Sequence, residues 1–119
     1  MKLTQLWQSR DKPTISFELF PARSEKAAEK LGMTIDKLAM LKPDFVSVTF
    51  GAGGSTREGS FQLVNKLKND KKLEVLAYFT GYGLSPGNII SVLDDYQKIG
   101  VENVLAVRGD PPEDPDFIP

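Results

Sequence analysis

Four short strand-like runs alternate with three amphipathic helical patterns along this chain, and that order restricts the folds open to it. The runs are rich in valine, phenylalanine and other strand-forming residues, and they cover residues 14–20, 44–50, 73–80 and 103–107. Apolar residues at helical spacing fill the three intervals, and helix-capping residues stand near their starts at Ser24, Ser55 and Ser85. Strands separated by helices of this length pair in parallel through right-handed crossovers. The sequence therefore predicts an α/β fold with four parallel strands and three intervening helices.

Two architectures accommodate this order: an open doubly wound sheet, and part of a (β/α)8 barrel, the TIM barrel. A complete barrel needs roughly 200 residues or more, whereas this chain has 119. It would therefore supply only half of a barrel. No repeat beyond the βα unit and no linker-like stretch divides the chain, so residues 1–119 are expected to form one segment.

The composition disfavours several classes of partner. Hydrophobic residues make up 40% of the chain and charged residues 26%, as in ordinary globular proteins. The net charge of -1 favours neither nucleic acid nor an anionic membrane as a partner. No apolar run approaches the roughly 20 residues that span a bilayer, and the first residues lack the pattern of a signal peptide. A cytoplasmic location is therefore expected.

Histidine and cysteine are both absent from the chain. Their absence removes disulfides, thiol nucleophiles and the commonest ligands of zinc, so no metal site is expected. Acid–base chemistry near neutral pH is left to carboxylates, tyrosine or lysine.

A carboxylate, Glu18, lies inside the first apolar run, and each later run ends in a polar group. Burying a charge is costly unless a partner or a function compensates for it. The polar groups at the later strand ends are Thr49, Thr80 and Asp110. In either architecture, ligands meet the carboxyl ends of parallel strands. These residues are therefore candidates for a binding or catalytic site.

Each candidate also has a purely structural interpretation. Glu18 would fit equally well as the partner of a lysine or arginine inside the sheet. Thr49 suits a strand because it is β-branched, and Asp110 suits a turn. Arg108, at the end of the fourth strand, would reach a phosphate or form a surface ion pair. The loop at 51–54 leads into a helix start, but it lacks a complete phosphate-loop motif, so a flexible turn is the favoured interpretation.

Four runs, taken in order, resemble the methylenetetrahydrofolate reductase family. They are SFELFPAR at 16–23, KPDFVSVTFGA at 42–52, YFT at 78–80 and LAVRGDP at 105–111. The resemblance covers about residues 14 to 112. The first, second and fourth runs are specific in combination, because their order and their spacing both match.

The resemblance implies a flavoprotein with a (β/α)8 barrel that binds FAD at the carboxyl ends of its strands. In such an oxidoreductase a reduced nicotinamide, NADH or NADPH, passes a hydride to the flavin. The flavin passes it to 5,10-methylenetetrahydrofolate and gives 5-methyltetrahydrofolate, in one-carbon metabolism and methionine biosynthesis. The implied substrate is this folate, and activity is expected only in a complete barrel.

The resemblance also implies roles for individual residues. Glu18 would contact the folate and act as the general acid that opens its imidazolidine ring, a role suited to a carboxylic acid kept protonated by apolar surroundings. Asp110 would lie near both the flavin and the pterin, where its charge would tune the flavin's potential. The residues implied to bind the flavin are Thr49, Tyr78, Thr80, Arg108, Gly109 and Asp110.

Two features depart from the family pattern. Tyr78 stands where members commonly carry a histidine that contacts the flavin, and a tyrosine still donates a hydrogen bond and stacks. The chain also stops soon after the fourth strand, four βα units short of a barrel. Two exposed sheet edges and an apolar face favour association. We therefore expect a fragment that forms a homo-oligomer or associates with a complementary barrel half.

Two other functions stay open. A truncated, non-catalytic flavin- or folate-binding or assembly module would carry the same motifs without turnover. An unrelated α/β domain would instead hold a nucleotide at the loop of residues 51–54.

Overall fold

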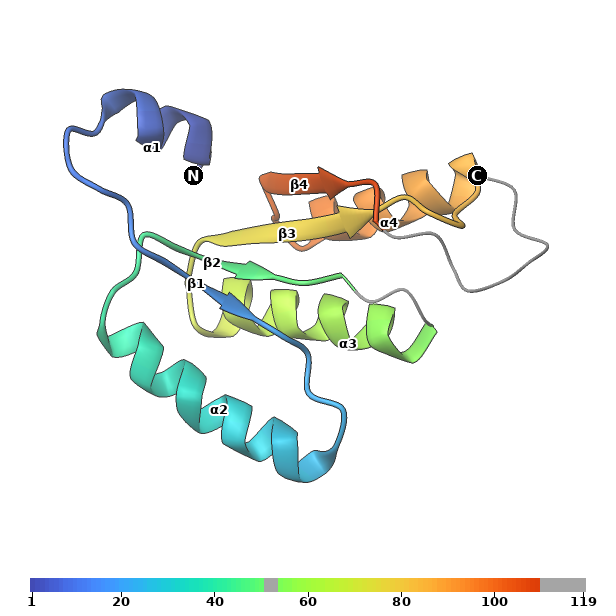
Figure 1. Cartoon of the computed structure of the whole chain (residues 1–119), viewed down its shortest axis with the longest axis horizontal. Coiled ribbons are helices and arrows are strands. Elements are labelled where there is room, and N and C mark those ends of the chain that lie inside the picture. Colours follow the sequence, from blue (N-terminus) through green and yellow to red (C-terminus); the bar gives the residue numbers. More distant parts are fainter. Residues whose placement is uncertain (51–53, 110–119) are drawn as a thin grey trace.

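Four parallel strands form one sheet, as the sequence predicts, and their order in the sheet is β1-β2-β3-β4 (Figure 1). The structure is a computed structural model of the 119-residue chain, and it describes residues 1–50 and 54–109, without the side chains of 54–57. The strands are β1 (Ser16–Leu19), β2 (Phe45–Val48), β3 (Val75–Thr80) and β4 (Asn103–Val107). Each strand pairs with the one that follows it in the sequence, so every connection is a crossover of the βαβ kind.

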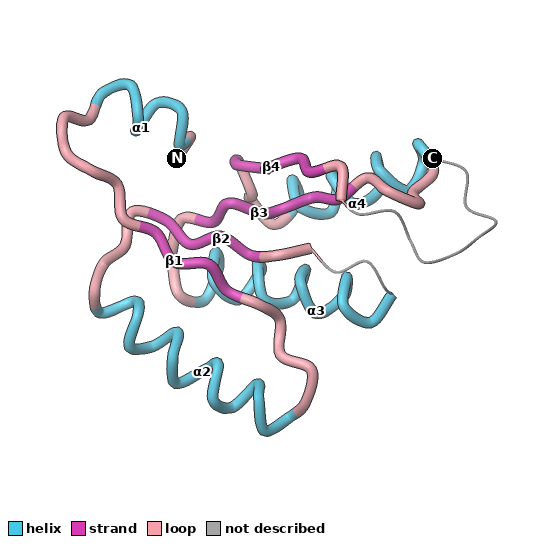
Figure 2. Tube along the Cα trace, viewed as in Figure 1, coloured by secondary structure: helices cyan, strands magenta, loops and turns pink. Residues whose placement is uncertain are grey.

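Three helices make these crossovers, and they all pack on the same face of the sheet (Figures 1 and 2). They are α2 (Glu25–Met40), α3 (Gly54–Asn65) and α4 (Pro86–Lys98), and a π-helical turn, Lys66–Asp70, extends α3. One core cluster joins the helices to the sheet through Ile35, Val46, Val48, Leu63, Val64, Val75, Ala77 and Tyr96. A doubly wound sheet reverses its strand order and carries helices on both faces. Sequential order with helices on one face is the arrangement of a barrel, so the fold is that of a partial TIM barrel.

Serine caps begin two of the three crossover helices. The hydroxyls of Ser24 and Ser85 each accept a hydrogen bond, of 3.1 and 3.2 Å, from the backbone N–H three residues further on. Pro86 is the first residue of α4, where its missing N–H leaves no donor unsatisfied. The prediction of a third cap at Ser55 was wrong, because α3 already begins at Gly54 and Ser55 lies inside the helix.

The first three strands are shorter than the runs that predicted them, and just before β1 and β2 a side chain joins the hydrogen bonding between the two segments. A carboxylate oxygen of Asp44 accepts a hydrogen bond of 2.8 Å from the N–H of Ile15. The N–H of Asp44 in turn donates to the carbonyl of Ile15 at 2.8 Å, and Arg10 forms an ion pair with the carboxylate. The bond from Ile15, followed by the contact with Arg10, holds the pKa of Asp44 below its usual range.

A short helix that the sequence did not predict, α1 (Leu3–Ser9), lies beyond the amino ends of the strands (Figure 1). Leu3 is buried, and its N–H donates to the side-chain oxygen of Asn103 in β4 at 2.8 Å. The rings of Trp7 and Phe45, the latter in β2, form a T-shaped pair with centroids 6.2 Å apart. Contacts with distant strands, and not local sequence pattern, therefore hold α1 in place.

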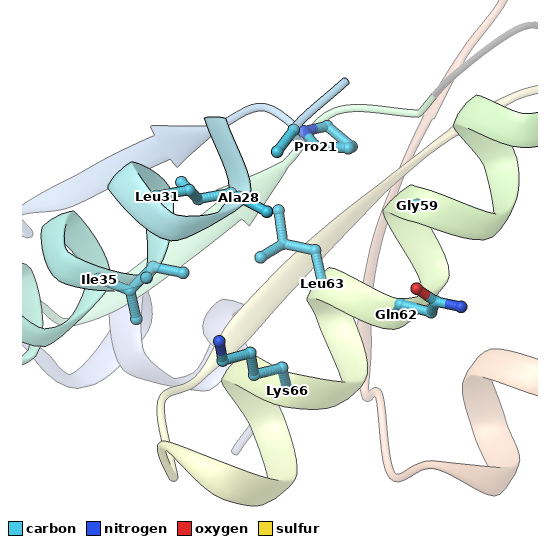
Figure 3. A pocket seen from close by; sticks show the side chains of 10 residues that line it. Pro21, Ala28, Leu31, Ile35, Gly59, Gln62, Leu63 and Lys66 are labelled. Carbon is cyan, nitrogen blue, oxygen red and sulfur yellow. The ribbon is translucent and has the colours of Figure 1, made fainter. Parts of the chain in front are cut away.

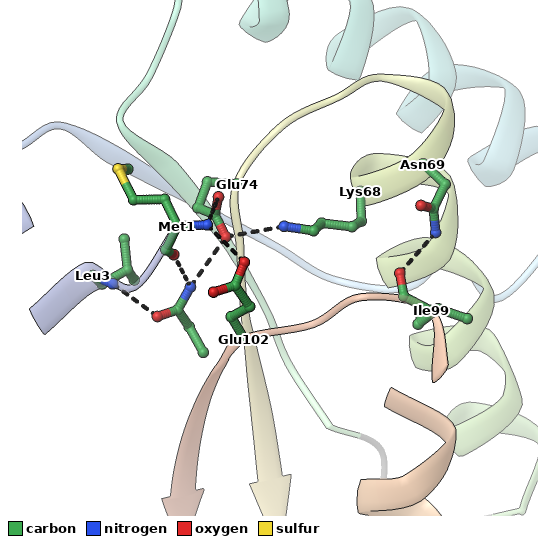
Figure 4. A network of polar contacts seen from close by, with 8 residues as sticks. Met1, Leu3, Lys68, Asn69, Glu74, Ile99 and Glu102 are labelled. Atoms are coloured by element: carbon green, nitrogen blue, oxygen red, sulfur yellow. Dashed lines mark hydrogen bonds and ion pairs between the residues drawn. The ribbon is translucent and has the colours of Figure 1, made fainter. Parts of the chain in front are cut away.

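A polar network joins the chain start to the amino ends of β3 and β4 (Figure 4). The buried Asn103 donates to the carbonyl of Met1 at 2.8 Å and to Glu74 at 3.1 Å. Glu74 also accepts from the amino group of Met1 at 2.9 Å and from Lys68 at 3.2 Å. The buried amide and the half-buried carboxylate thereby find protein partners, as buried polar groups require.

The buried phenol of Tyr96 makes the free energy of unfolding depend on pH in the alkaline range. Its ring lies 5.9 Å from that of Phe61, and its burial raises the pKa of the phenol from 10.0 to about 12. The unfolded chain therefore releases this proton near pH 10, while the folded chain keeps it until about pH 12. The contribution of Tyr96 to the free energy of unfolding is complete below the unfolded-state pKa of 10.0, and it is lost as the pH rises through about 12.

We expect Tyr96→Phe to remove this alkaline loss. Between about pH 10 and pH 12, the free energy of unfolding of the parent should fall by roughly 2–3 kcal/mol more than that of the variant. Urea unfolding followed by circular dichroism measures the difference. Tyr82→Phe, at a less buried phenol, serves as the control for the loss of a tyrosine hydroxyl. If the free energy of unfolding changed equally with pH in the parent and in Tyr96→Phe, the raised pKa of Tyr96 would be contradicted.

Candidate functional site

The strand register gathers polar side chains on the sheet face that the helices leave open. Glu18 of β1 pairs with Ser47 of β2, and Ser47 pairs with Leu76 of β3. Tyr78 lies two residues beyond Leu76, on the same face, because side chains alternate along a strand. Three adjacent strands thus present Glu18, Ser47 and Tyr78 together, toward the carboxyl ends of the sheet.

The surroundings of Glu18 differ from the sequence-based expectation. We expected a carboxylic acid enclosed by an apolar strand, but Glu18 is exposed. Its apolar neighbours, Phe17 and Leu19, turn toward the helices because they alternate with it, and they join the core. In the described ranges, no lysine or arginine forms an ion pair with Glu18.

The hydroxyl of Tyr78 connects the cluster across three strands. Its hydrogen bond to the Glu18 carboxylate is the main cause that raises the pKa of Tyr78. A hydrogen bond with the hydroxyl of Ser47 acts in the opposite direction, and partial burial of the ring adds to the rise. The phenol therefore stays protonated at neutral pH and is a donor to the carboxylate.

The end of β2 is fixed from the helix side. The hydroxyl of Ser60 in α3, which is fully buried, donates to the carbonyl of Thr49 at 2.8 Å. The N–H of Thr49 donates to the carbonyl of Leu19 at 3.2 Å. Thr49 thus lies directly after the end of β2, and its backbone is held by both neighbouring elements.

The end of β4 carries an exposed cation over an aromatic ring. The guanidinium of Arg108 lies 5.3 Å from the centroid of the Tyr82 ring, and its Nη2 donates to the Tyr82 hydroxyl at 3.2 Å. The N–H of Gly81 donates to the carbonyl of Val107 at 3.3 Å, which holds the loop after β3 beside β4. Arg108 is therefore at the carboxyl edge of the sheet, with its position restricted by Tyr82.

Of the predicted site residues, the described chain brings Glu18 into contact with Tyr78, and it brings Gly109 close to Thr80. Thr49, Thr80, Arg108 and Gly109 lie at the ends of neighbouring strands, at the same edge. Asp110 and residues 51–53 of the glycine-rich loop lie outside the described residues.

Three residues with a place in or behind this site were not among the predicted ones: Ser47, Ser60 and Tyr82. Alternation along β2 placed Ser47 on the face of Glu18, but only the register shows that the two are direct neighbours. No sequence pattern connects Ser60 with Thr49 or Tyr82 with Arg108, because packing between separate elements makes those contacts.

A groove of about 200 Å³ lies elsewhere, between α2 and α3 (Figure 3). Leu31 and Ile35 from α2, Leu63 from α3, and Lys66 from the π-helical turn that extends α3 point into it. These helices cover the sheet face opposite to Glu18, so the groove is separate from the strand-end cluster. Within the described ranges, none of the helices combines the length and the apolar character that crossing a bilayer requires.

Sequential parallel strands, helices on one face, and polar groups at the carboxyl ends define a barrel-type α/β protein with a candidate ligand site. The family model described as methylenetetrahydrofolate reductase matches residues 2–118. The chain belongs to the methylenetetrahydrofolate reductase family.

Named relatives agree with this family. The chain is 35% identical over 100 residues to 5,10-methylenetetrahydrofolate reductase of Pectobacterium carotovorum, covering 84% of this chain and 34% of the relative. It is 35% identical over 98 residues to the Escherichia coli protein of the same name, covering 82% and 33%. It is also 35% identical over 101 residues to methylenetetrahydrofolate reductase (NADH) 1 of Zea mays, covering 85% and 17%. The chain thus spans about a third of the length of the bacterial relatives.

The backbone conformation and the close surroundings at position 109 both favour glycine over other residues. Its φ is 83°, in the left-handed region, and an added Cβ would overlap Cγ2 of Thr80. Gly83 also has a positive φ, of 74°, but a Cβ there would meet no atom within 4 Å. Replacing each glycine by alanine therefore separates two costs: both variants strain the backbone, and only the one at Gly109 adds a steric overlap with Thr80.

We expect Gly109→Ala to lower the free energy of unfolding by roughly 1–3 kcal/mol more than Gly83→Ala, because it adds overpacking against Thr80 to a similar backbone strain. Denaturant titration of both variants measures the difference. Equal losses would show that the close approach to Thr80 does not constrain this strand end.

Proposed function

We propose that this chain forms the N-terminal half-barrel segment, residues 1–119, of a methylenetetrahydrofolate reductase. The proposed reaction is the reduction of 5,10-methylenetetrahydrofolate to 5-methyltetrahydrofolate, carried out by the complete barrel. The observation that carries the proposal is the cluster of Glu18, Ser47 and Tyr78 on the open sheet face of a chain that belongs to this family. The cytoplasmic location stays a prediction.

FAD is the proposed cofactor, and the residues at the carboxyl edge fit parts of it. Leu105 and Val107 expose apolar surface on the same sheet face as Tyr78, which suits a flat aromatic ring. Arg108 exposes a guanidinium that suits a phosphate. Thr49 and Thr80 add hydroxyl groups at neighbouring strand ends. When bound, FAD would supply the redox chemistry, taking a hydride from NADH or NADPH and passing it to the folate.

Glu18 is the proposed general acid toward the folate. Its exposure on the open face leaves the carboxyl group accessible to a substrate. In this role it donates a proton to the departing nitrogen as the imidazolidine ring opens, so that the ring carbon becomes able to accept a hydride. Asp110, outside the described residues, is proposed to contact the flavin and the pterin. The name of the maize relative includes NADH, which supports a nicotinamide as the hydride donor.

We expect Glu18→Gln in the complete reductase to reduce the rate of folate reduction by about 10²- to 10⁴-fold, because the amide cannot supply the proton. Reduction of the flavin by nicotinamide should continue, since it does not need that proton. Stopped-flow absorbance separates the two half-reactions. Glu29→Gln, which changes an exposed carboxylate on α2, is the matched control. Folate turnover near the parent's rate in Glu18→Gln would remove Glu18 from this role.

A second candidate function is a non-catalytic flavin- or folate-binding or assembly module. The observation that favours it is the open sheet. Among the described residues, β1 and β4 each pair along one edge only, and β4 exposes Val104, Leu105 and Val107. Unpaired edges and apolar surface promote association with a second copy or with a complementary barrel half.

We expect the isolated chain to self-associate, giving a mass above the 13.2 kDa of one copy by size exclusion with light scattering. Val107→Lys should reduce this association, because it places a charge on the open face next to an unpaired edge. Lys2→Ala, at an exposed residue of the chain start, is a control for general surface change. A well-folded parent that stays monomeric at high concentration would count against both forms of association.

A further inference from the structure

We propose that Tyr78 is a positioning residue for Glu18: its hydroxyl, anchored by Ser47, holds the carboxyl group in one orientation on the open face. This inference rests on the proposed function, in which Glu18 is the acid. It departs from the role that the family resemblance implies for Tyr78, which is contact with the flavin. It also gives Ser47 a role, as the anchor of the tyrosine.

The register of the strands places the three side chains for this task. Glu18 and Ser47 are direct partners in the β1–β2 pairing. Tyr78 projects from the same face of β3, two residues beyond the partner of Ser47. Its long side chain therefore reaches back across β2, where the hydroxyl meets both Ser47 and the Glu18 carboxylate.

Burial decreases from Ser47 through Tyr78 to Glu18, which suits Ser47 as the anchor of the other two side chains. Ser47 is 5% exposed, so its hydroxyl is largely removed from water and needs a protein partner. Tyr78 is half-buried and Glu18 is exposed. Ser47, in the packed part of β2, therefore fixes the Tyr78 hydroxyl, and that hydroxyl restricts the motion of the exposed Glu18 side chain. An exposed glutamate loses much rotamer freedom when it is held, and a hydrogen bond offsets that cost.

The phenol is suited to this role over a wide range of pH. An ordinary phenol, with a pKa of about 10, is already a neutral donor throughout the range in which carboxyl groups change charge. Contact with Glu18 raises the pKa of Tyr78 further. Orientation of Glu18 by Tyr78 would therefore not depend on the ionisation of Tyr78 near neutral pH. A histidine at this position would change its own charge within that range.

The first test uses the chain itself and needs no cofactor. NMR of ring-labelled tyrosine follows the alkaline titration of each phenol, with Tyr78→Phe identifying the Tyr78 signal. We expect Glu18→Gln to move the Tyr78 titration to lower pH, because the carboxylate that raises its pKa is gone. The Tyr96 signal, with a pKa of about 12, reports that the core stays folded. Glu29→Gln is the control. An unchanged Tyr78 midpoint in Glu18→Gln would overturn the proposal.

The second test uses the complete reductase and compares its two half-reactions. We expect Tyr78→Phe to slow folate reduction by about ten- to a hundredfold, since a misplaced acid loses much of its effect. Flavin reduction by nicotinamide should fall far less. In a Glu18→Gln background, Tyr78→Phe should add little, because the two residues act as one unit.

The outcomes separate the two proposals. A Tyr78→Phe enzyme with the parent's folate rate and pH profile would overturn the positioning role and leave the proposed function intact. Equal losses in both half-reactions with an altered flavin spectrum would assign Tyr78 to the flavin and also overturn it. A parent enzyme that does not reduce the folate would reject the proposed function, whereas the tyrosine titration tests the contact independently of activity.

Discussion

The parallel register of β1, β2 and β3 decides which side chains become core and which become site. It turns one set of residues toward the helices, namely Leu19, Val46, Val48, Val75 and Ala77. It leaves Glu18, Ser47 and Tyr78 on the opposite face. A shift of one residue in β1 would bury the charge of Glu18 against the helices and expose Leu19. The hydrophobic core and the polar cluster are therefore consequences of the same pairing.

The helix layer also supports the site from behind. The buried hydroxyl of Ser60 holds the carbonyl of Thr49 at the end of β2. At the end of β4, Arg108 is placed over Tyr82, and Gly109 permits a close approach to Thr80. These contacts fix the backbone where the strands end, so the groups at the carboxyl edge stand on packed elements. Such support is what a site with fixed geometry requires.

Much of the fold could be predicted from the sequence because its signals are local. Alternating strand and helix patterns predicted all four strands, and the bounds of β4 were the same as predicted. Ser24 and Ser85 marked two helix starts, since capping depends on residues three positions apart. The helix α1 was not predicted, because its stability comes from contacts with Asn103 and Phe45, far away in the chain.

The site could be predicted only in part. The positions of Glu18 and Thr49 near strand ends followed from the strand pattern. The exposure of Glu18 did not, because alternation assigns a residue to a face without saying what covers that face. The contact with Tyr78 depends on the register of three strands, which no single run of sequence contains. Ser60 and Tyr82 were missed because packing between separate elements makes their contacts, and no local sequence pattern records that packing.

A crystal structure of the complete reductase with flavin and 5-methyltetrahydrofolate would test the central claim most directly. We expect the pterin to lie on the open face of β1–β3, with the Glu18 carboxyl within about 3 Å of a pterin or bridging-water atom. We also expect the Tyr78 hydroxyl to contact that carboxyl group. A pterin bound away from this face, with Glu18 paired to a lysine or arginine, would contradict it.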